Sequence, residues 1–168
     1  DPQEFPRLLE VYNRYPIVEL TLHPRVRKAF YSGSVDMEMF AYCAENSKNP
    51  LCYNGDICGF EDIERIKTRF PKVEAVMIGR GLIGDPGMLT PGGTTAAALE
   101  EMYDAMLEEY MVLFGGSRNA MFRLKEHWGM LIHRFRDSEK LGKRLRKTTD
   151  LEEYKAIVRE IFHSLPLK

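Results

Sequence analysis

The sequence has 168 residues, of which 44% are hydrophobic and 29% charged, and its formal net charge is −1. This apolar content can build a core, which excludes a chain disordered throughout, and the near-neutral charge gives no overall preference for nucleic acid or membrane. No stretch approaches the roughly 18 to 20 uncharged apolar residues of a membrane-spanning helix, and the first residues do not resemble a secretory signal. Three cysteines cannot all pair, so we expect free thiols and a soluble cytoplasmic protein without membrane contacts.

The first 90 residues predict short strands that alternate with helices. Helices are predicted over residues 4–14, 36–48 and 60–69, and strands over residues 17–22, 50–54 and 74–78. The first strand has an apolar face and a polar face, which are Val18, Leu20 and Leu22 against Glu19, Thr21 and His23. Because helices separate the strands, we expect right-handed βαβ units and a parallel sheet.

The pattern changes after a run rich in Gly and Pro at residues 84–93. From there the sequence predicts only helices, over about 95–114, 117–135, 138–147 and 150–163. Thr149 and Glu152 fit a capping box for the last of them. We therefore expect an α/β part, residues 1–90, followed by an all-α helical bundle domain, residues 91–168.

Basic residues gather in the helical part. Residues 117–147 hold ten Lys/Arg against three Asp/Glu, a local net charge of +7. One interpretation is a solvated helical face. The other is a footprint for a phosphate backbone, because aromatic side chains are interleaved with the charges. These side chains are Phe122, His127, Trp128 and Phe135.

Polar segments follow each of the three predicted strands, at the edge where parallel α/β sheets bind ligands. The third segment, MIGRGLIGDPG, contains Gly79, Gly81 and Gly84 beside Arg80, a pattern that can cradle a phosphate group. The second, NGDI at 54–57, is equally compatible with a turn that caps the next helix. The histidine after the first strand is equally compatible with a core position.

Taken together, the strings LTLHPR, YNGDI and VMIGRGLIGDP resemble the C-terminal part of the tRNA-dihydrouridine synthases. These are flavin enzymes with a TIM barrel followed by a helical tRNA-binding domain. The resemblance covers nearly the whole chain. It implies a partial TIM barrel of about three C-terminal βα units over residues 1–90, and a helical tRNA-binding domain over residues 91–168.

The resemblance implies which residues bind the cofactor FMN. After the first strand, His23 and Arg25 would lie beside the flavin. After the second, Asn54, Gly55 and Asp56 would wrap the ribityl phosphate. After the third, Gly79 and Arg80 would hold the phosphate. Tyr31 and Gly33 fall in a loop that would line the uridine pocket.

The resemblance also implies contacts with tRNA in the basic helical part. The candidate RNA-binding residues are Arg123, Lys125, His127, Lys143 and Arg144. The match here is to a region and not to a sharp motif. Because tRNA presents a phosphate backbone, these cations would grip the RNA while the target base leaves its stack.

Two parts of the family pattern are missing from the sequence. The general-acid cysteine of an N-x-G-C-P-like loop does not occur, nor does a Lys-x-Arg strand that contacts the flavin, so we expect no catalytic residue in this chain. A complete barrel alone typically needs about 250 residues. We therefore expect a C-terminal fragment that is inactive alone, retains FMN weakly or not at all, and self-associates through an open sheet edge.

The function implied for the full-length enzyme is reduction of a uridine C5=C6 bond in tRNA, with NADPH as the reductant of FMN. One alternative is a small-molecule FMN oxidoreductase of the dihydroorotate dehydrogenase type, which shares the strand-end glycines. Another is a non-catalytic RNA-binding module made of a half-barrel and a helical bundle. The sequence does not specify which uridine is modified.

Overall fold

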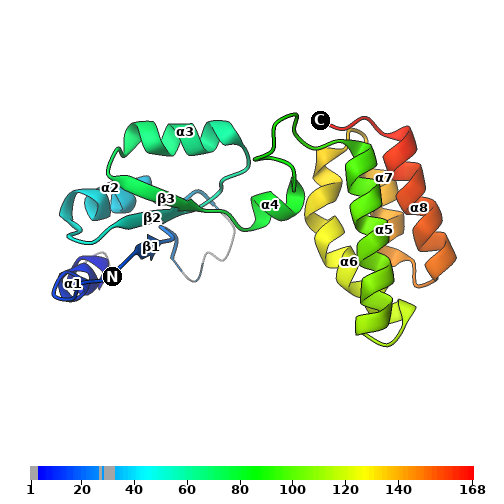
Figure 1. The fold of residues 1–168 in the computed structure, drawn as a ribbon, viewed down its shortest axis with the longest axis horizontal. Coiled ribbons are helices and arrows are strands. Elements are labelled where there is room, and N and C mark those ends of the chain that lie inside the picture. Colours follow the sequence, from blue (N-terminus) through cyan, green and yellow to red (C-terminus); the bar gives the residue numbers. More distant parts are fainter. Residues whose placement is uncertain (1–3, 27, 29–32) are drawn as a thin grey trace. The chain divides into compact units, whose positions relative to one another are not determined.

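The fold comes from a computed structural model, which describes residues 4–26, 28 and 33–168 (Figure 1). The chain divides into two compact units, Asp1–Gly79 and Arg80–Lys168. The sequence predicts a domain boundary after residue 90, whereas the structure groups residues 80–90 with the helices. The assignment of the two parts to flavin and to tRNA stays a prediction.

The first unit is a three-stranded parallel sheet with helices between its strands. Its elements are α1 (Glu4–Tyr12), β1 (Leu20–Leu22), α2 (Met37–Asn46), β2 (Leu51–Asn54), α3 (Phe60–Arg69) and β3 (Val73–Met77). The strand order is β1-β2-β3, and both neighbouring pairs are parallel. The predicted mixed α/β architecture with a parallel sheet is confirmed, and it is consistent with part of a TIM barrel.

The core of this unit forms where α2 packs on the central strand. Phe40 of α2 is fully buried, and its ring meets the ring of Tyr53 at 4.8 Å and that of Phe70 at 5.0 Å, both edge to face. Asp36 caps α2, because its carboxylate accepts hydrogen bonds from the amides of Glu38 and Met39. These contacts hold α2 against the central strand and fix its beginning at Asp36.

The first strand is shorter than predicted. It begins at Leu20 and not at residue 17, because the Ile17 amide donates to the side-chain oxygen of Asn49 (3.1 Å) instead of joining the sheet. Val18, predicted to share the apolar face, is consequently 90% exposed. Glu19 and Thr21 are exposed, as expected for the polar face.

The second unit is helical throughout. Its elements are α4 (Arg80–Gly84), α5 (Ala96–Leu113), α6 (Ser117–Leu131), the 3₁₀ helix η2 (Ile132–Arg134), α7 (Glu139–Lys147) and α8 (Leu151–Ser164). Trp128 lies at the centre of its core, between the rings of Tyr103 and Phe162. The Trp128 indole N–H donates to the buried hydroxyl of Tyr154 at 3.0 Å. The predicted helical bundle is confirmed.

The segment after α4 is tied to the helices by a polar cluster. The Asp85 carboxylate accepts a hydrogen bond from the Thr94 hydroxyl and pairs with the Arg134 guanidinium at 3.0 Å. The Gly87 amide donates to the same hydroxyl at 2.8 Å. These contacts explain why residues 80–90 belong to the second unit.

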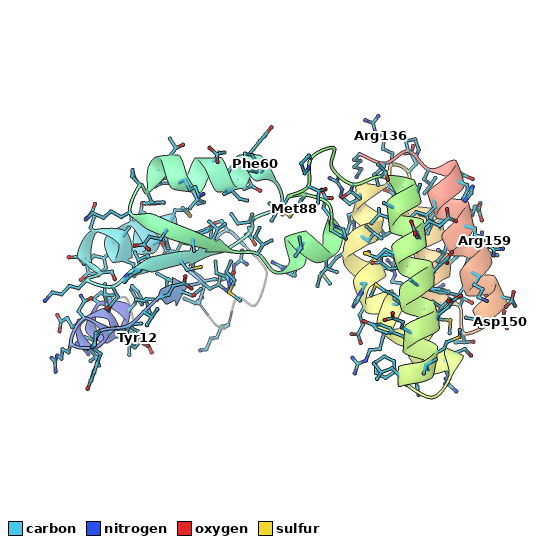
Figure 2. All side chains as sticks on the ribbon, in the orientation of Figure 1. Tyr12, Phe60, Met88, Arg136, Asp150 and Arg159 are labelled. Carbon is cyan, nitrogen blue, oxygen red and sulfur yellow. The ribbon has the colours of Figure 1, made fainter. Side chains whose placement is uncertain are left out.

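Two helical predictions need correction. The helix predicted over 117–135 ends at Leu131 and continues as η2, after which Phe135 becomes extended and pairs with Leu167. The last helix is capped by Asp150, whose carboxylate accepts from the Glu153 amide at 2.8 Å, and not by the predicted Thr149–Glu152 box (Figure 2). Among the described residues, no helix is long and apolar enough to cross a membrane.

Candidate flavin and tRNA site

The segment after β1 is held against the beginning of α2. His23 is exposed, and its carbonyl accepts a hydrogen bond from the Arg25 amide at 2.8 Å. The next carbonyl, that of Pro24, accepts from the Asp36 amide at 2.7 Å. Since Asp36 caps α2, the turn at 23–25 is fastened to a helix and presents an exposed imidazole at the carboxyl end of β1.

Arg25 joins the carboxyl ends of two strands. Its side chain is only 3% exposed, and its Nη2 and Nη1 atoms lie 2.6 Å and 3.4 Å from the two carboxylate oxygens of Asp56. Nη2 also donates to the Gly33 carbonyl at 2.8 Å. This fork geometry is the one that guanidinium and carboxylate groups favour. Arg25 therefore holds the segment after β1, the loop before α2 and the turn after β2 together.

The turn after β2 has no room for a Cβ atom at its centre unless neighbouring side chains shift. A Cβ atom on Gly55 would lie 2.8 Å from the Tyr53 hydroxyl and 2.9 Å from Val35 Cγ1, both closer than real contacts allow. Asp56 then takes a φ of +34°, in the left-handed region. The Asn54 side-chain nitrogen lies 3.0 Å from the sulfur of Met77, the last residue of β3. The turn thus reaches the ends of both neighbouring strands.

The third predicted segment begins a helix and not only a turn. Gly79 is the last residue of the first unit, and a Cβ atom there would meet no atom within 4 Å. Arg80 is exposed and begins α4. Of the loop residues predicted to line a uridine pocket, Gly33 has a φ of +74°, and Tyr31 lies outside the described residues.

The three thiols of the first unit differ in environment. Cys43 and Cys52 are buried, and burial raises the pKa of Cys43 to about 11. Burial likewise raises the pKa of Cys52. Cys58 is exposed, and its amide donates to the Asp62 carboxylate at 2.7 Å. At neutral pH both buried thiols are therefore protonated.

Asp62 fastens the beginning of α3 behind the turn. Burial acts to raise the pKa of its carboxyl, but the hydrogen bond from the Cys58 amide and the neighbouring Arg65 guanidinium outweigh it and lower the pKa below the usual value. The charged form is thus the one that the fold selects.

The predicted RNA-binding residues lie on two helices of the second unit. Arg123 on α6 is exposed and pairs with Glu126 at 3.3 Å, and Arg144 on α7 pairs with Glu160 of α8 at 3.1 Å. Lys143 is exposed, whereas His127 is half-buried with its ring 6.3 Å from that of Tyr110.

Lys125 has a structural contact that its sequence position does not reveal. Its ammonium donates to the carbonyl of Thr148, the residue that ends α7, and burial lowers its pKa. Carbonyl groups at a helix C-terminus favour a cation. Lys125 therefore stabilises the end of α7, whatever its part in RNA binding.

A family model described as "Dihydrouridine synthase (Dus)" matches residues 10–164. The chain belongs to this family. It is 33% identical over 121 residues to a probable tRNA-dihydrouridine synthase of Rhizobium leguminosarum bv. phaseoli, which covers 69% of this chain and 37% of that relative. With a probable tRNA-dihydrouridine synthase of Rickettsia bellii, identity is 31% over 116 residues, 64% of this chain and 35% of the relative.

A third relative aligns over more of the chain. The tRNA-dihydrouridine(16) synthase of Neisseria meningitidis serogroup B (strain ATCC BAA-335 / MC58) is 25% identical over 151 residues, 84% of this chain and 45% of the relative. The matched part of the Dus chain therefore spans between about a third and under half of these relatives.

Sequence reasoning placed polar residues at the strand ends of this Dus chain but missed how they are connected. The partners Arg25 and Asp56 are 31 residues apart, and no local pattern links them. It also treated the aromatic residues of the basic segment alike, although Trp128 and Phe135 are buried in the core and Phe122 is 44% exposed. A helical wheel of α6 would have separated Phe122 from Trp128.

Proposed function

We propose that the protein containing this chain is a tRNA-dihydrouridine synthase of the cytoplasm, which reduces the C5=C6 bond of a uridine in tRNA. Membership of the Dus family over residues 10–164 supports this proposal. The observation that carries it is that polar residues after β1 and β2 are joined at one edge of a parallel sheet, with Asn54 reaching the end of β3. That edge is where α/β proteins bind their ligands.

FMN is the cofactor that we propose for this edge, with NADPH as its reductant. The described residues fit an anionic, ribityl-bearing group: Gly55 leaves no Cβ in the turn, Asn54 offers an amide, Gly79 has open space where a Cβ would stand, and Arg80 follows it in the sequence. When bound, FMN supplies hydride transfer to the uridine ring. We expect the proton donor to come from a part of the barrel outside these 168 residues.

The residues of this chain would bind and orient. Asn54 and Asp56 would hold hydroxyl groups of the ribityl chain, and Gly79 and Arg80 the phosphate group. His23, exposed at the end of β1, would face the flavin. Arg25 is a positioning residue in this scheme, because its buried guanidinium contacts Asp56 and Gly33.

The helical unit would bind the tRNA backbone. Its segment 117–147 has a net charge of +7, and electrostatic binding of phosphates falls steeply as salt rises. Arg123, Lys143 and Arg144 are exposed there and could each neutralise a phosphate. Salt-dependent tRNA binding would separate this proposal from a small-molecule flavin oxidoreductase.

The decisive experiment uses the full-length protein. Expressed in a bacterial strain without its own tRNA-dihydrouridine synthases, it should restore dihydrouridine to tRNA, measured by mass spectrometry of tRNA nucleosides. Asn54→Ala should weaken FMN binding by about ten-fold, since a hydrogen bond to a polar ligand contributes about 1.5 kcal/mol. Asn46→Ala is the matched control, because that amide donates within α2 to the Tyr42 carbonyl. Dihydrouridine-free tRNA would overturn the proposal.

The sheet edges suggest a second property of the isolated chain. Within the described residues, β1 and β3 each pair with one strand, so both leave a ladder edge open. We propose that the 168-residue chain self-associates through these edges and retains FMN weakly or not at all. Sedimentation as a clean monomer at high concentration would contradict the self-association. Purification of a yellow, stoichiometric flavin complex would contradict the weak retention of FMN.

A further inference from the structure

One phenylalanine of the basic segment is exposed and has two cations near its ring. Phe122 on α6 is 44% exposed. The Lys125 ammonium lies 5.1 Å from its ring centroid and the Arg118 guanidinium 5.9 Å. Cations at these distances are attracted to the ring and order the side chain, which keeps an exposed fraction of 44%.

A second ring with a cation lies at the same end of α6. Phe114, just after α5, has the Arg123 guanidinium 6.0 Å from its centroid, and the ring of Tyr110 packs against it at 5.2 Å. Gly115 and Gly116, with φ of +67° and +159°, connect the two helices here. Arginines and aromatic rings therefore alternate where α5 turns into α6.

The core does not explain this exposed ring. Trp128 and Phe135 pack against each other and against Phe162, whereas Phe122 faces away from them and is exposed. Carboxylates lie near these cations as well: Glu126 is paired with Arg123, and the charge of Glu153 acts on Lys125. The Phe122 ring with the Arg118 and Lys125 side chains is called the Phe122 platform below.

The chemistry of the Phe122 platform fits an unpaired nucleotide. A base removed from its helix stack has a planar face for the ring, and its phosphates have negative charge for the flanking cations. A paired duplex offers phosphates but keeps its bases stacked. An acidic peptide offers charge but no planar group of matching size.

We propose that the Phe122 platform stacks an unpaired nucleobase of the bound tRNA, with Arg118 beside its phosphates. This rests on the tRNA binding of the proposed function and assigns a specific contact within it. The platform contacts only unpaired nucleotides, whereas the exposed basic residues elsewhere on the unit contact the phosphate backbone of paired and unpaired RNA alike. Its residues are not among the strand-end residues, of which all but Arg80 lie in the first unit.

The test measures stacking directly. An RNA hairpin with 2-aminopurine in its loop is titrated with the 168-residue chain, and both fluorescence and binding are recorded. The wild type should quench the fluorescence. Phe122→Ala should abolish the quenching and weaken binding by about ten-fold, as expected for one lost base stack, while the dependence of binding on salt is unchanged. Phe122→Trp should restore both.

The controls separate this inference from the proposed function. Phe60→Ala removes a ring that is even more exposed, at 60%, at the beginning of α3 in the other unit, and this variant should bind the hairpin like the wild type (Figure 2). A fully paired RNA of the same stem should bind Phe122→Ala and wild type equally. Quenching that survives in Phe122→Ala would overturn the platform alone. A wild type that binds no RNA would overturn the tRNA binding on which it rests.

Discussion

The Arg25 guanidinium and the Asp56 carboxylate meet in a two-point contact, 2.6 Å at the closer pair of atoms, although 31 residues separate them along the chain. Arg25 is almost fully buried, whereas the Asp56 side chain is 41% exposed. One end of the pair therefore belongs to the core and the other to the surface at the strand ends. This arrangement positions an acidic group where a ligand would bind.

We expect Arg25→Ala to destabilise the first unit by about 2 kcal/mol, because it removes a buried donor from both Asp56 and the Gly33 carbonyl. The chain supplies a reporter for each unit. All three cysteines lie in the first unit, and the single tryptophan lies in the second. In Arg25→Ala, the buried cysteines should become reactive at a lower urea concentration than in the wild type. The urea midpoint of the Trp128 fluorescence should stay unchanged.

Arg25→Lys is the conservative control for that measurement. It keeps the positive charge but replaces the planar fork by a point charge, so it should recover only part of the loss. A thiol transition that does not move in Arg25→Ala would show that the pair contributes nothing to stability.

Gly55→Ala and Gly59→Ala form a matched pair of substitutions on the same loop. A methyl group at residue 55 meets the Tyr53 hydroxyl and Val35, so we expect a loss of about 1–3 kcal/mol from overpacking. A methyl group at residue 59 meets open space in an extended backbone. Because Gly59 is the N-cap of α3, we still expect the free energy of unfolding to fall by a few tenths to about 1 kcal/mol. Equal urea midpoints for the two variants would contradict the steric argument.

Thiol labelling should distinguish the three cysteines. At pH 8 in the folded chain, only the exposed Cys58 should react quickly with a thiol reagent. Burial keeps Cys43 protonated, with a pKa of about 11, and excludes the reagent from Cys43 and Cys52. Mass spectrometry should find one label in buffer and three in urea. Rapid triple labelling in buffer would mean that the first unit opens readily.

The Asp62 carboxyl predicts a dependence of stability on pH. Its folded-state pKa is lowered, so ionised Asp62 stabilises the fold above the unfolded-state pKa, near 4, and this contribution is lost as the pH falls through the lower folded value. As the pH is lowered from 6 to 2, the urea midpoint should fall less steeply in Asp62→Asn than in the wild type. Glu64→Gln, at an exposed position of the same helix, should follow the wild type.

Tyr154→Phe should destabilise the second unit. The substitution keeps the ring but leaves the buried Trp128 N–H without its acceptor, which costs about 1–3 kcal/mol. The Trp128 fluorescence midpoint in urea should drop accordingly. Tyr15→Phe removes an exposed hydroxyl from the other unit and should leave this midpoint unchanged.

Local patterns were sufficient for much of the fold. The cap at Asp36 uses atoms only two or three residues apart, and the predicted helix over 60–69 matches α3 residue for residue. The strand ends and their polar residues followed from the alternation of strands with helices. Such features depend on neighbouring residues, so the amino-acid order alone determines them.

The tertiary structure decided what each polar or aromatic side chain contacts. Arg25 meets Asp56, Lys125 meets the Thr148 carbonyl, and Phe122 is exposed while Trp128 lies in the core. The partners are 31 and 23 residues apart, and helix packing alone selects which face of α6 is covered. The sequence thus determined which chemical groups stand at the strand ends and on α6. Packing between distant segments determined which of these groups make contacts within the fold and which are exposed to solvent.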